Sequence, residues 1–140
     1  MIATDHDPHT EEEKDGSYFN APAGLPLVQH ALLMTLEHVR AGRFSIELAV
    51  RKTSHAVADL FGVQERGYIR EGCWADIVLV DPTRPTRVQR ENLLYKCGWS
   101  PLENYEFGAS IRATLVNGQL AWDGAAVSPA QGRRLDFTPR

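Results

Sequence analysis

The chain is short of the features that mark membrane, secreted and nucleic-acid-binding proteins. Its 140 residues contain no apolar run near the roughly 20 residues that a membrane-spanning helix requires. No basic segment followed by an apolar one, the mark of a secretory leader, opens the sequence. Lysine and arginine number 15 against 18 acidic residues, so the net charge is −3 and no basic patch suits nucleic acid. We therefore expect a cytoplasmic protein that binds neither membrane nor nucleic acid.

Cysteine is equally scarce. Cys73 and Cys97 are the only two cysteines, and they lie far apart with no Cys-x-x-Cys motif. We expect two reduced, packed thiols rather than a disulfide framework. The remaining composition is ordinary for a globular domain, with 43% hydrophobic and 24% charged residues, and a chain of this length can bury a moderate core.

The pattern of apolar residues predicts a helical first half. Residues 1–5 read as a short buried strand, and residues 6–23 read as a long polar loop, which is a kind of segment that often carries function. Helices are predicted at about 25–41, 45–52 and 55–61, because apolar residues recur there every three or four positions. Ser45 and Gly62 are the expected cap and stop of the second and third helices.

The second half is richer in strand signals. Residues 75–81 are rich in β-branched residues and predict a strand. After an irregular segment at 83–108, residues 111–122 predict a hairpin whose Asn-Gly pair forms a type I′ turn. Residues 128–140 are predicted to be a frayed tail.

The first strand has no partner within residues 6–70. Buried backbone groups without hydrogen bonds are costly, and a parallel strand needs neighbours on both sides. The sequence therefore predicts that this chain is a piece of something larger. Asp5-His6-Asp7-Pro8-His9 follows this strand, and a carboxylate with nearby histidines at a strand end is typical of the mouth of an α/β barrel, where catalytic groups gather.

These residues, together with several collinear motifs, resemble dihydroorotase of the amidohydrolase superfamily. The pieces Asp-His-x-Pro-His and Pro-Ala-Gly-Leu-Pro occur together here, which favours dihydroorotase over its relatives dihydropyrimidinase and allantoinase. The matching segments are 3–10, 12–14, 21–30, 52–55, 66–72, 74–81, 95–101 and 116–118.

The resemblance implies an α/β fold, namely the C-terminal part of a (β/α)8 metal-dependent amidohydrolase barrel plus part of a small β domain. Residues 1–66 would hold the last barrel strand, the substrate loop and the C-terminal barrel helices. Residues 67–127 would form the partial β domain, and residues 128–140 the tail. The implied activity on a small-molecule substrate is the interconversion of N-carbamoyl-L-aspartate and dihydroorotate, a step of pyrimidine biosynthesis.

The resemblance also assigns roles to individual residues. Asp5 matches the carboxylate that ligates the metal and carries a proton between a metal-bound hydroxide and the leaving amide nitrogen. Zinc lowers the pKa of its bound water to roughly 7, and a nearby carboxylate can accept that proton. His9 matches the residue that holds the substrate carboxylate, and the backbone at Ala23 and Gly24 matches the segment that hydrogen-bonds the substrate. His6 is assigned a supporting role that orients the site.

Two positions depart from the family pattern. Asp7 stands where a small or apolar residue is usual, so its carboxylate would either repel that of Asp5 or point outward. Ala56-Val57 stands where an Asn-Pro pair is common, which alters the local turn. The other histidines, His30, His38 and His55, are expected to be structural or exposed, and Trp99 and Trp122 are expected to be core or interface aromatics.

The family's zinc centre needs a His-x-His motif, further histidines and, in many members, a carboxylated lysine. No His-x-His occurs here, and Asp5 with two loop histidines would hold zinc only poorly. We therefore expect the chain to be inactive alone and to need a complementing N-terminal barrel half, with homo-oligomerisation as another way to cover its apolar face. Two alternatives stay open, which are a related hydrolase of cyclic ureides such as hydantoin or allantoin, and a non-catalytic protein that docks on a full-length homologue.

Overall fold

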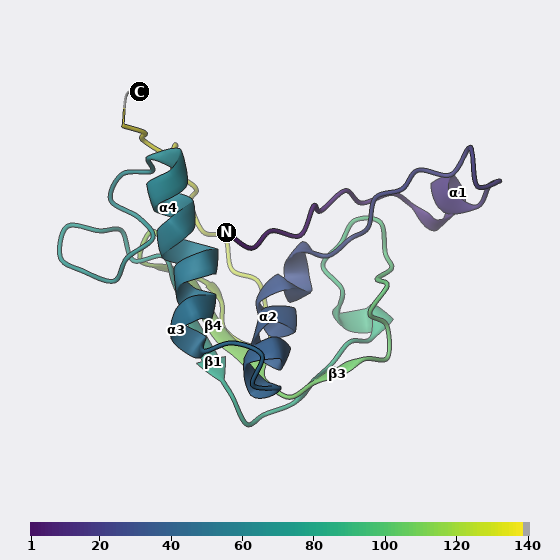
Figure 1. Ribbon diagram of the computed structural model, residues 1–140. Helices are drawn as coiled ribbons and strands as arrows, with labels where there is room; N and C mark the ends of the chain where they lie inside the picture. The colour runs from purple at the N-terminus through teal and green to yellow at the C-terminus, as the bar shows by residue number, and fades with distance from the viewer. Residues whose placement is uncertain (139–140) are drawn as a thin grey trace.

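The computed structural model describes residues 1–138. Helices and a small antiparallel sheet form the body of the molecule, and residues 7–24 form an arm that projects from it (Figure 1). The N-terminus lies on the body close to the last helix, and the described end of the chain lies beside the same helix (Figure 1). The site residues expected from the sequence therefore sit where the arm joins the body.

The helical elements largely follow the predicted pattern. They are α1 (Glu11–Lys14), the 3-10 turn η1 (Val28–His30), α2 (Ala31–Arg40), α3 (Ile46–Val50), the π-helical turn η2 (Arg51–His55) and α4 (Ala56–Phe61). Within residues 1–138 none of these helices has the length and apolar character that crossing a bilayer demands.

The two helices predicted at 45–52 and 55–61 are in fact one continuous helix. It begins as predicted at Ser45, whose Oγ accepts a hydrogen bond from the Leu48 N–H at 3.2 Å. It then passes from α3 through η2 into α4, because no proline ring at 56–57 clashes with the preceding turn. Gly62, with a φ of 66°, ends it in the left-handed conformation, also as predicted.

The sheet is entirely antiparallel. β1 (Ile77–Asp81) pairs with β4 (Ser110–Val116), which pairs in turn with β5 (Gln119–Trp122). The predicted Asn-Gly turn joins β4 to β5 with φ values of 52° and 78°, as a type I′ turn requires.

The segment 83–108, predicted to be irregular, contains short regular elements. It holds β2 (Thr86–Arg87), the 3-10 turn η3 (Arg90–Asn92) and β3 (Glu106–Phe107), and β2 and β3 pair with each other. Such two-residue strands carry too little periodicity to be recognised in a sequence.

Residues 1–5 do not form the predicted strand. The Ile2 N–H donates to the Lys52 carbonyl at 3.0 Å, and His6 makes an isolated parallel bridge with Leu25. No strand lies beside residues 1–5 in the described part of the chain. A barrel strand is stabilised by its neighbours, and this chain supplies none.

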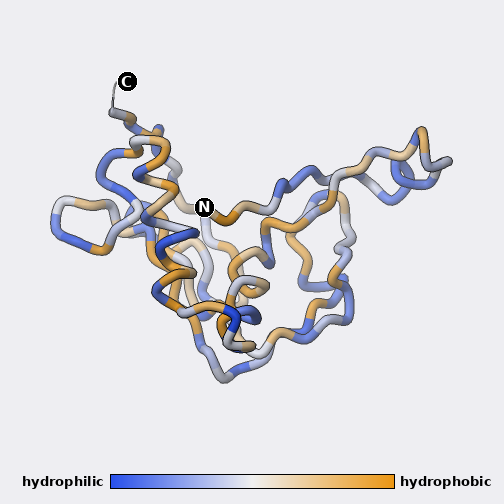
Figure 2. The backbone as a smooth tube through the Cα atoms, in the orientation of Figure 1, coloured by the Kyte–Doolittle hydropathy of each residue, from blue (hydrophilic) through white to orange (hydrophobic). Residues whose placement is uncertain are grey.

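The core is small and lies where α2 packs against β3. Val88 and Phe107 are 0% and 1% exposed, and Leu33 and Ala109 complete the buried cluster. Hydrophobic residues, orange in Figure 2, concentrate in the helices and strands of the body, whereas strongly hydrophilic residues mark α1 in the arm. The two cysteines are free and partly buried within this body.

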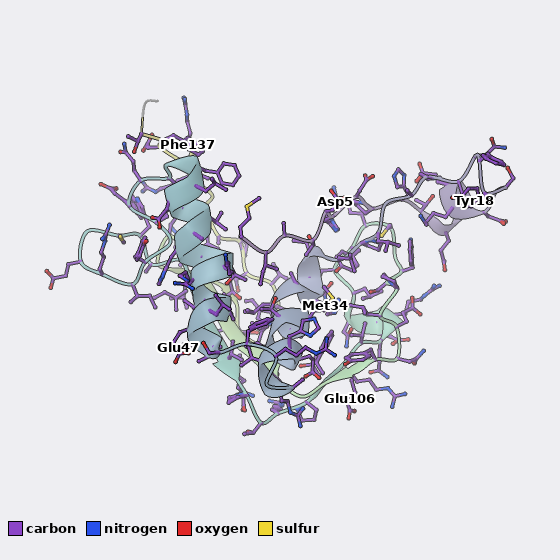
Figure 3. All side chains as sticks on the ribbon, viewed as in Figure 1. Asp5, Tyr18, Met34, Glu47, Glu106 and Phe137 are labelled. Atoms are coloured by element: carbon purple, nitrogen blue, oxygen red, sulfur yellow. The ribbon has the colours of Figure 1, made fainter. Side chains whose placement is uncertain are left out.

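Residues 136–138 of the tail predicted to be frayed instead pair with the chain just after α4, and residues 139–140 of that tail lie outside the described residues. The Gln64 N–H donates to the Asp136 carbonyl at 2.9 Å, and the Thr138 N–H donates to the Gly62 carbonyl at 2.8 Å. Phe137 lies beside the last turn of the helix (Figure 3). These bonds are made across some 70 residues, a separation that local sequence patterns do not report.

We expect Phe107→Ala to lower the free energy of unfolding by about 3–5 kcal/mol, because it removes the largest side chain of a small core and leaves a cavity. Urea denaturation followed by tryptophan fluorescence measures this loss. Phe19→Ala is the matched control, since Phe19 is 93% exposed and should leave stability nearly unchanged. Similar losses in both variants would contradict the placement of the core.

Candidate active site

Asp5 occupies the bend where the N-terminal segment turns from the body into the arm (Figure 3). Its φ is 50°, a left-handed conformation that aspartate tolerates better than most residues other than glycine. The side chain is exposed, and within residues 1–138 its carboxylate makes no hydrogen bond or ion pair. Asp5 thus has a carboxylate free to act on a bound molecule.

A cleft of about 1070 Å³ opens beside Asp5. Its walls come from the N-terminal segment, α2, α3 and β1, and they are mainly apolar. Several of these side chains remain substantially exposed, including Ile2, Val28, Ile46, Val50 and Val78. Apolar surface of this extent is usually covered by another polypeptide or a ligand.

His6 fastens the N-terminal segment to the start of the next helix. Its Nδ1 accepts hydrogen bonds from the Leu27 N–H at 3.1 Å and the Val28 N–H at 3.3 Å. These N–H groups lie at a helix start, where no preceding turn supplies acceptors. An Nδ1 that accepts must be unprotonated, so the neutral ring carries its proton on Nε2. The supporting role expected for His6 is therefore to fix the backbone directly after Asp5 to the helix start.

Tyr95 fastens the same turn from a position next to His6. Its hydroxyl oxygen accepts a hydrogen bond from the Gln29 N–H at 2.9 Å, and its ring centroid lies 5.5 Å from that of His6. Burial raises the pKa of the Tyr95 hydroxyl, although the N–H groups of Gln29 and His30 oppose this effect. The hydroxyl therefore stays neutral near pH 7.

Local hydrogen bonds order the arm, which carries α1 at its outer end (Figure 1). Thr10 and Glu13 form a capping box at α1, with Thr10 N–H donating to Glu13 Oε2 at 2.8 Å and Glu13 N–H donating to Thr10 Oγ1 at 3.2 Å. These bonds hold the pKa of Glu13 below its usual value. Lys14 Nζ donates to the carbonyls of Pro22 and Gly24 at 2.6 and 2.9 Å, which ties the two sides of the arm together.

His9 lies just before the start of α1, with a carboxylate facing each of its ring nitrogens. Its Nε2 is 3.5 Å from Asp7 Oδ2, and its Nδ1 is 3.7 Å from Glu13 Oε2. The backbone carbonyl of His9 accepts a hydrogen bond from Trp99 Nε1 at 2.7 Å. The His9 side chain is 28% exposed, so the ring is held in place but can still be reached from solvent.

Gly24 packs directly on Asp7. A Cβ at position 24 would overlap the Asp7 backbone and lie 2.5 Å from Asp7 Oδ2, so only glycine allows this approach. Within residues 1–138 the N–H groups of Ala23 and Gly24 donate no hydrogen bond. These two backbone donors are available to a ligand.

The structure brings together some of the expected site residues but not all of them. His9 and Gly24 meet around Asp7 at the base of the arm, whereas Asp5 lines the cleft on the body side and His9 does not. The supporting contacts of Lys14 and Tyr95 were not predicted. Tyr95 lies 66 residues from its partner Gln29, and no spacing rule links residues so far apart.

The residues of this chain do not make a metal site by themselves. In the part of the chain that the structure describes, no three His, Cys, Asp or Glu side chains lie close enough to hold a metal ion. His6 Nδ1 is committed to backbone N–H groups, and both nitrogens of His9 face carboxylates. Asp5 alone could offer one ligand, which is too few for the four-coordinate zinc expected from the resemblance.

Comparison with known sequences and structures places the chain in a family of metabolic enzymes. The sequence model of the amidohydrolase family matches residues 27–121. Because this stretch is more than half of the 140 residues, the chain belongs to the amidohydrolase family.

Similar curated sequences carry a more particular name. A dihydroorotase of Halobacterium salinarum is 38% identical over 135 residues, which cover 96% of this chain and 32% of that protein. A dihydroorotase of Methanosphaera stadtmanae is 33% identical over 119 residues, covering 85% of this chain and 28% of that protein. The chain thus spans about a third of the length of the curated relatives it matches.

Solved structures with a similar fold include dihydropyrimidinase from Brevibacillus agri, with a TM-score of 0.80 and 27% identity over 88% of this chain and 28% of that one. D-hydantoinase from a Thermus species has a TM-score of 0.82 at 23% identity, over 89% of this chain and 28% of that one. The body of the molecule therefore has the fold of the corresponding part of these amidohydrolases.

We expect Tyr95→Phe to lower the free energy of unfolding by about 1 kcal/mol, because the Gln29 N–H loses its acceptor at a partly buried helix start. Tyr18→Phe is the matched control, since Tyr18 is 90% exposed. Urea denaturation of the two variants measures the difference. Equal stability of the two variants would mean that water replaces the hydroxyl without loss.

His30 makes stability depend on pH. It is 3% exposed and stacks on Phe107, and within residues 1–138 its Nδ1 has no hydrogen-bond partner. Burial lowers the pKa of His30 below the usual 6.5. The unfolded chain therefore takes up this proton before the folded one does. Its contribution to stability is complete above pH 6.5 and is lost as the pH falls through the lowered folded pKa.

We expect the wild-type chain to lose more stability than His30→Phe between about pH 7.5 and about pH 5.5, measured as the shift of the urea midpoint. His38→Phe is the control, because His38 is exposed and should keep the wild-type pH dependence. A wild-type slope in His30→Phe would show that other groups cause the pH dependence.

Proposed function

We propose that this chain is the C-terminal part of a dihydroorotase-like cyclic amide hydrolase, which interconverts N-carbamoyl-L-aspartate and dihydroorotate in pyrimidine biosynthesis. The observation that carries the proposal is the 38% identity to a dihydroorotase over 96% of the chain. The arrangement of Asp5, His9 and Gly24 around the junction of arm and body supports it chemically.

Asp5 is the proton carrier in this proposal. Hydrolysis of the ring adds water to a carbonyl carbon and breaks the bond from that carbon to the ring nitrogen. The Asp5 carboxylate takes a proton from the attacking water and delivers it to the departing nitrogen, which would otherwise leave as an unstable anion. The free, exposed carboxylate beside the cleft suits this role.

His9, Ala23 and Gly24 bind the substrate. Trp99 Nε1 holds the His9 backbone through its carbonyl, and Glu13 faces the ring Nδ1, so the ring can offer an N–H to a carboxylate with little loss of side-chain entropy. The free N–H groups of Ala23 and Gly24 are donors for the ring carbonyl and the carboxylate. Lys14 keeps these donors in position by binding the carbonyls on either side of Ala23.

The rest of the barrel must come from polypeptide outside this chain. The cleft beside Asp5 is about 1070 Å³ and mainly apolar, and the similar hydantoinase structure extends well beyond the 28% that this chain covers. We therefore assign the cleft to the preceding part of an amidohydrolase barrel. That part would also bring the remaining ligands of the metal that this family suggests.

A related reaction is the second candidate. The similar solved structures are a dihydropyrimidinase and hydantoinases, so the substrate could be another cyclic ureide. The same residues would then carry the proton and hold the ring, but no substrate carboxylate would be needed at His9. The third candidate is a non-catalytic protein that docks on a full-length homologue. It would bind through the same cleft and catalyse no reaction.

The test is complementation. The chain is co-expressed with the Halobacterium salinarum dihydroorotase from which the segment matching this chain has been deleted, and dihydroorotate hydrolysis is assayed with added zinc. We expect activity from the pair and none from the chain alone. Asp5→Asn should lower kcat by about 100-fold or more, the usual contribution of a general acid-base group, whereas the exposed Asp15→Asn should not.

Each alternative has its own signature in this assay. A pair that hydrolyses hydantoin but not dihydroorotate supports the second candidate. A stable pair without activity on either compound supports docking without catalysis. Full activity in Asp5→Asn would overturn the role of Asp5 as proton carrier.

A further inference from the structure

The Asp7 carboxylate lies close to two groups, the His9 ring and the backbone of Gly24. Its Oδ2 lies 3.5 Å from His9 Nε2, and the same oxygen lies over the backbone of Gly24, where it would be 2.5 Å from a Cβ. The Asp7 side chain is 66% exposed and the His9 side chain 28% exposed. A mostly exposed carboxylate thus lies against a less exposed imidazole ring and a backbone turn.

His9 and Gly24 are the groups that the proposed function assigns to the carboxylate of the substrate, and this inference rests on that proposal. We propose that Asp7 is a specificity-determining residue, whose carboxylate occupies the place of the substrate carboxylate and so disfavours acidic ligands relative to uncharged cyclic amides. An acidic ligand at His9 Nε2 competes with Asp7, whose Oδ2 already lies 3.5 Å from that nitrogen.

The surrounding charges strengthen this competition. Glu13 Oε2 already faces the other ring nitrogen of His9 at 3.7 Å, so a ligand carboxylate would be a third anion around one ring. Lys14 is the cation at the base of the arm, but its ammonium group is bound to the carbonyls of Pro22 and Gly24. The anions of Asp7 and Glu13 therefore bias the subsite against a further negative charge.

The solvent exposure of Asp7 and His9 sets how strongly Asp7 can change the affinity for an acidic ligand. Asp7 and His9 are a solvent-exposed pair, and such pairs contribute little energy because water screens them. Since Asp7 is mostly exposed, it can rotate into solvent without leaving a buried group unpaired. Removing its charge should therefore change the affinity for an acidic ligand by roughly threefold to tenfold rather than by orders of magnitude.

Dihydroorotate and dihydrouracil are a suitable pair of probes, because they differ only by one carboxylate. In the complemented enzyme we expect Asp7→Asn to lower KM for dihydroorotate by roughly threefold to tenfold and to leave KM for dihydrouracil unchanged within about twofold. Asp15→Asn is the matched control. Asp15 lies on the same arm, and its carboxylate makes no ion pair within residues 1–138, so neither KM should change.

A second measurement does not need activity. The ring nitrogens of His9 are followed by NMR in the 140-residue chain while dihydroorotate or dihydrouracil is added. We expect Asp7→Asn to shift the His9 signals before any ligand is present, and to bind dihydroorotate more tightly than the wild-type chain does. Unchanged His9 signals, or equal gains for both probes, would overturn the role of Asp7.

The two proposals fail in different ways. If the complemented enzyme is inactive while Asp7→Asn still tightens dihydroorotate binding at His9, the proposed function fails and the competition by Asp7 stands. If the enzyme hydrolyses dihydroorotate and Asp7→Asn leaves its KM unchanged, the competition fails and the proposed function stands.

Discussion

The site depends on how the backbone N–H groups at the start of the η1–α2 helix are satisfied, because the helix itself supplies no acceptor for them. A helix start leaves several backbone donors without partners, and this one has no capping side chain of its own. His6 accepts two of these bonds and Tyr95 a third. The N-terminal segment, the helix and the segment before β3 are thereby joined at one turn. Asp5 is held in position because it directly precedes His6, which accepts two of these hydrogen bonds.

That arrangement explains how the arm can project from the body and still be ordered at its base. The bonds of His6 hold the chain on the outward path, and Lys14 holds it on the return path through the carbonyls of Pro22 and Gly24. Trp99 reaches the His9 carbonyl from the β-rich half of the chain. The base of the arm is therefore a junction of segments that are remote in sequence. Its geometry belongs to the fold as a whole rather than to a local motif.

The elements with local signals were the ones that the sequence could predict. The Ser45 cap, the Gly62 stop and the Asn-Gly hairpin each depend on a few adjacent residues, and all three are confirmed. The strand at 1–5 was wrong because a strand is defined by its neighbours, and the described chain offers none. The break at 52–55 was wrong because no proline interrupts the helix there.

The candidate site, too, could be predicted from the sequence only in part. The amidohydrolase family was recognised from motifs in the sequence and is confirmed by the match over residues 27–121. The position of the Asp7 carboxylate could not be settled, since repelling Asp5 and pointing outward were both open. The structure shows the Asp7 side chain mostly exposed, as the second alternative has it, with its Oδ2 3.5 Å from His9 Nε2. This contact depends on the close approach of Gly24, which only the folded arm reveals.

The bonds from Lys14 have a consequence for how the arm can vary. They close the backbone between positions 14 and 24 into a loop whose neck is held without help from its tip. At the tip, Tyr18 and Phe19 are 90% and 93% exposed and contact mainly each other. Insertions, deletions or a backbone cut at the tip would therefore leave the neck intact. The loop can therefore change in length while the groups at its neck keep their positions.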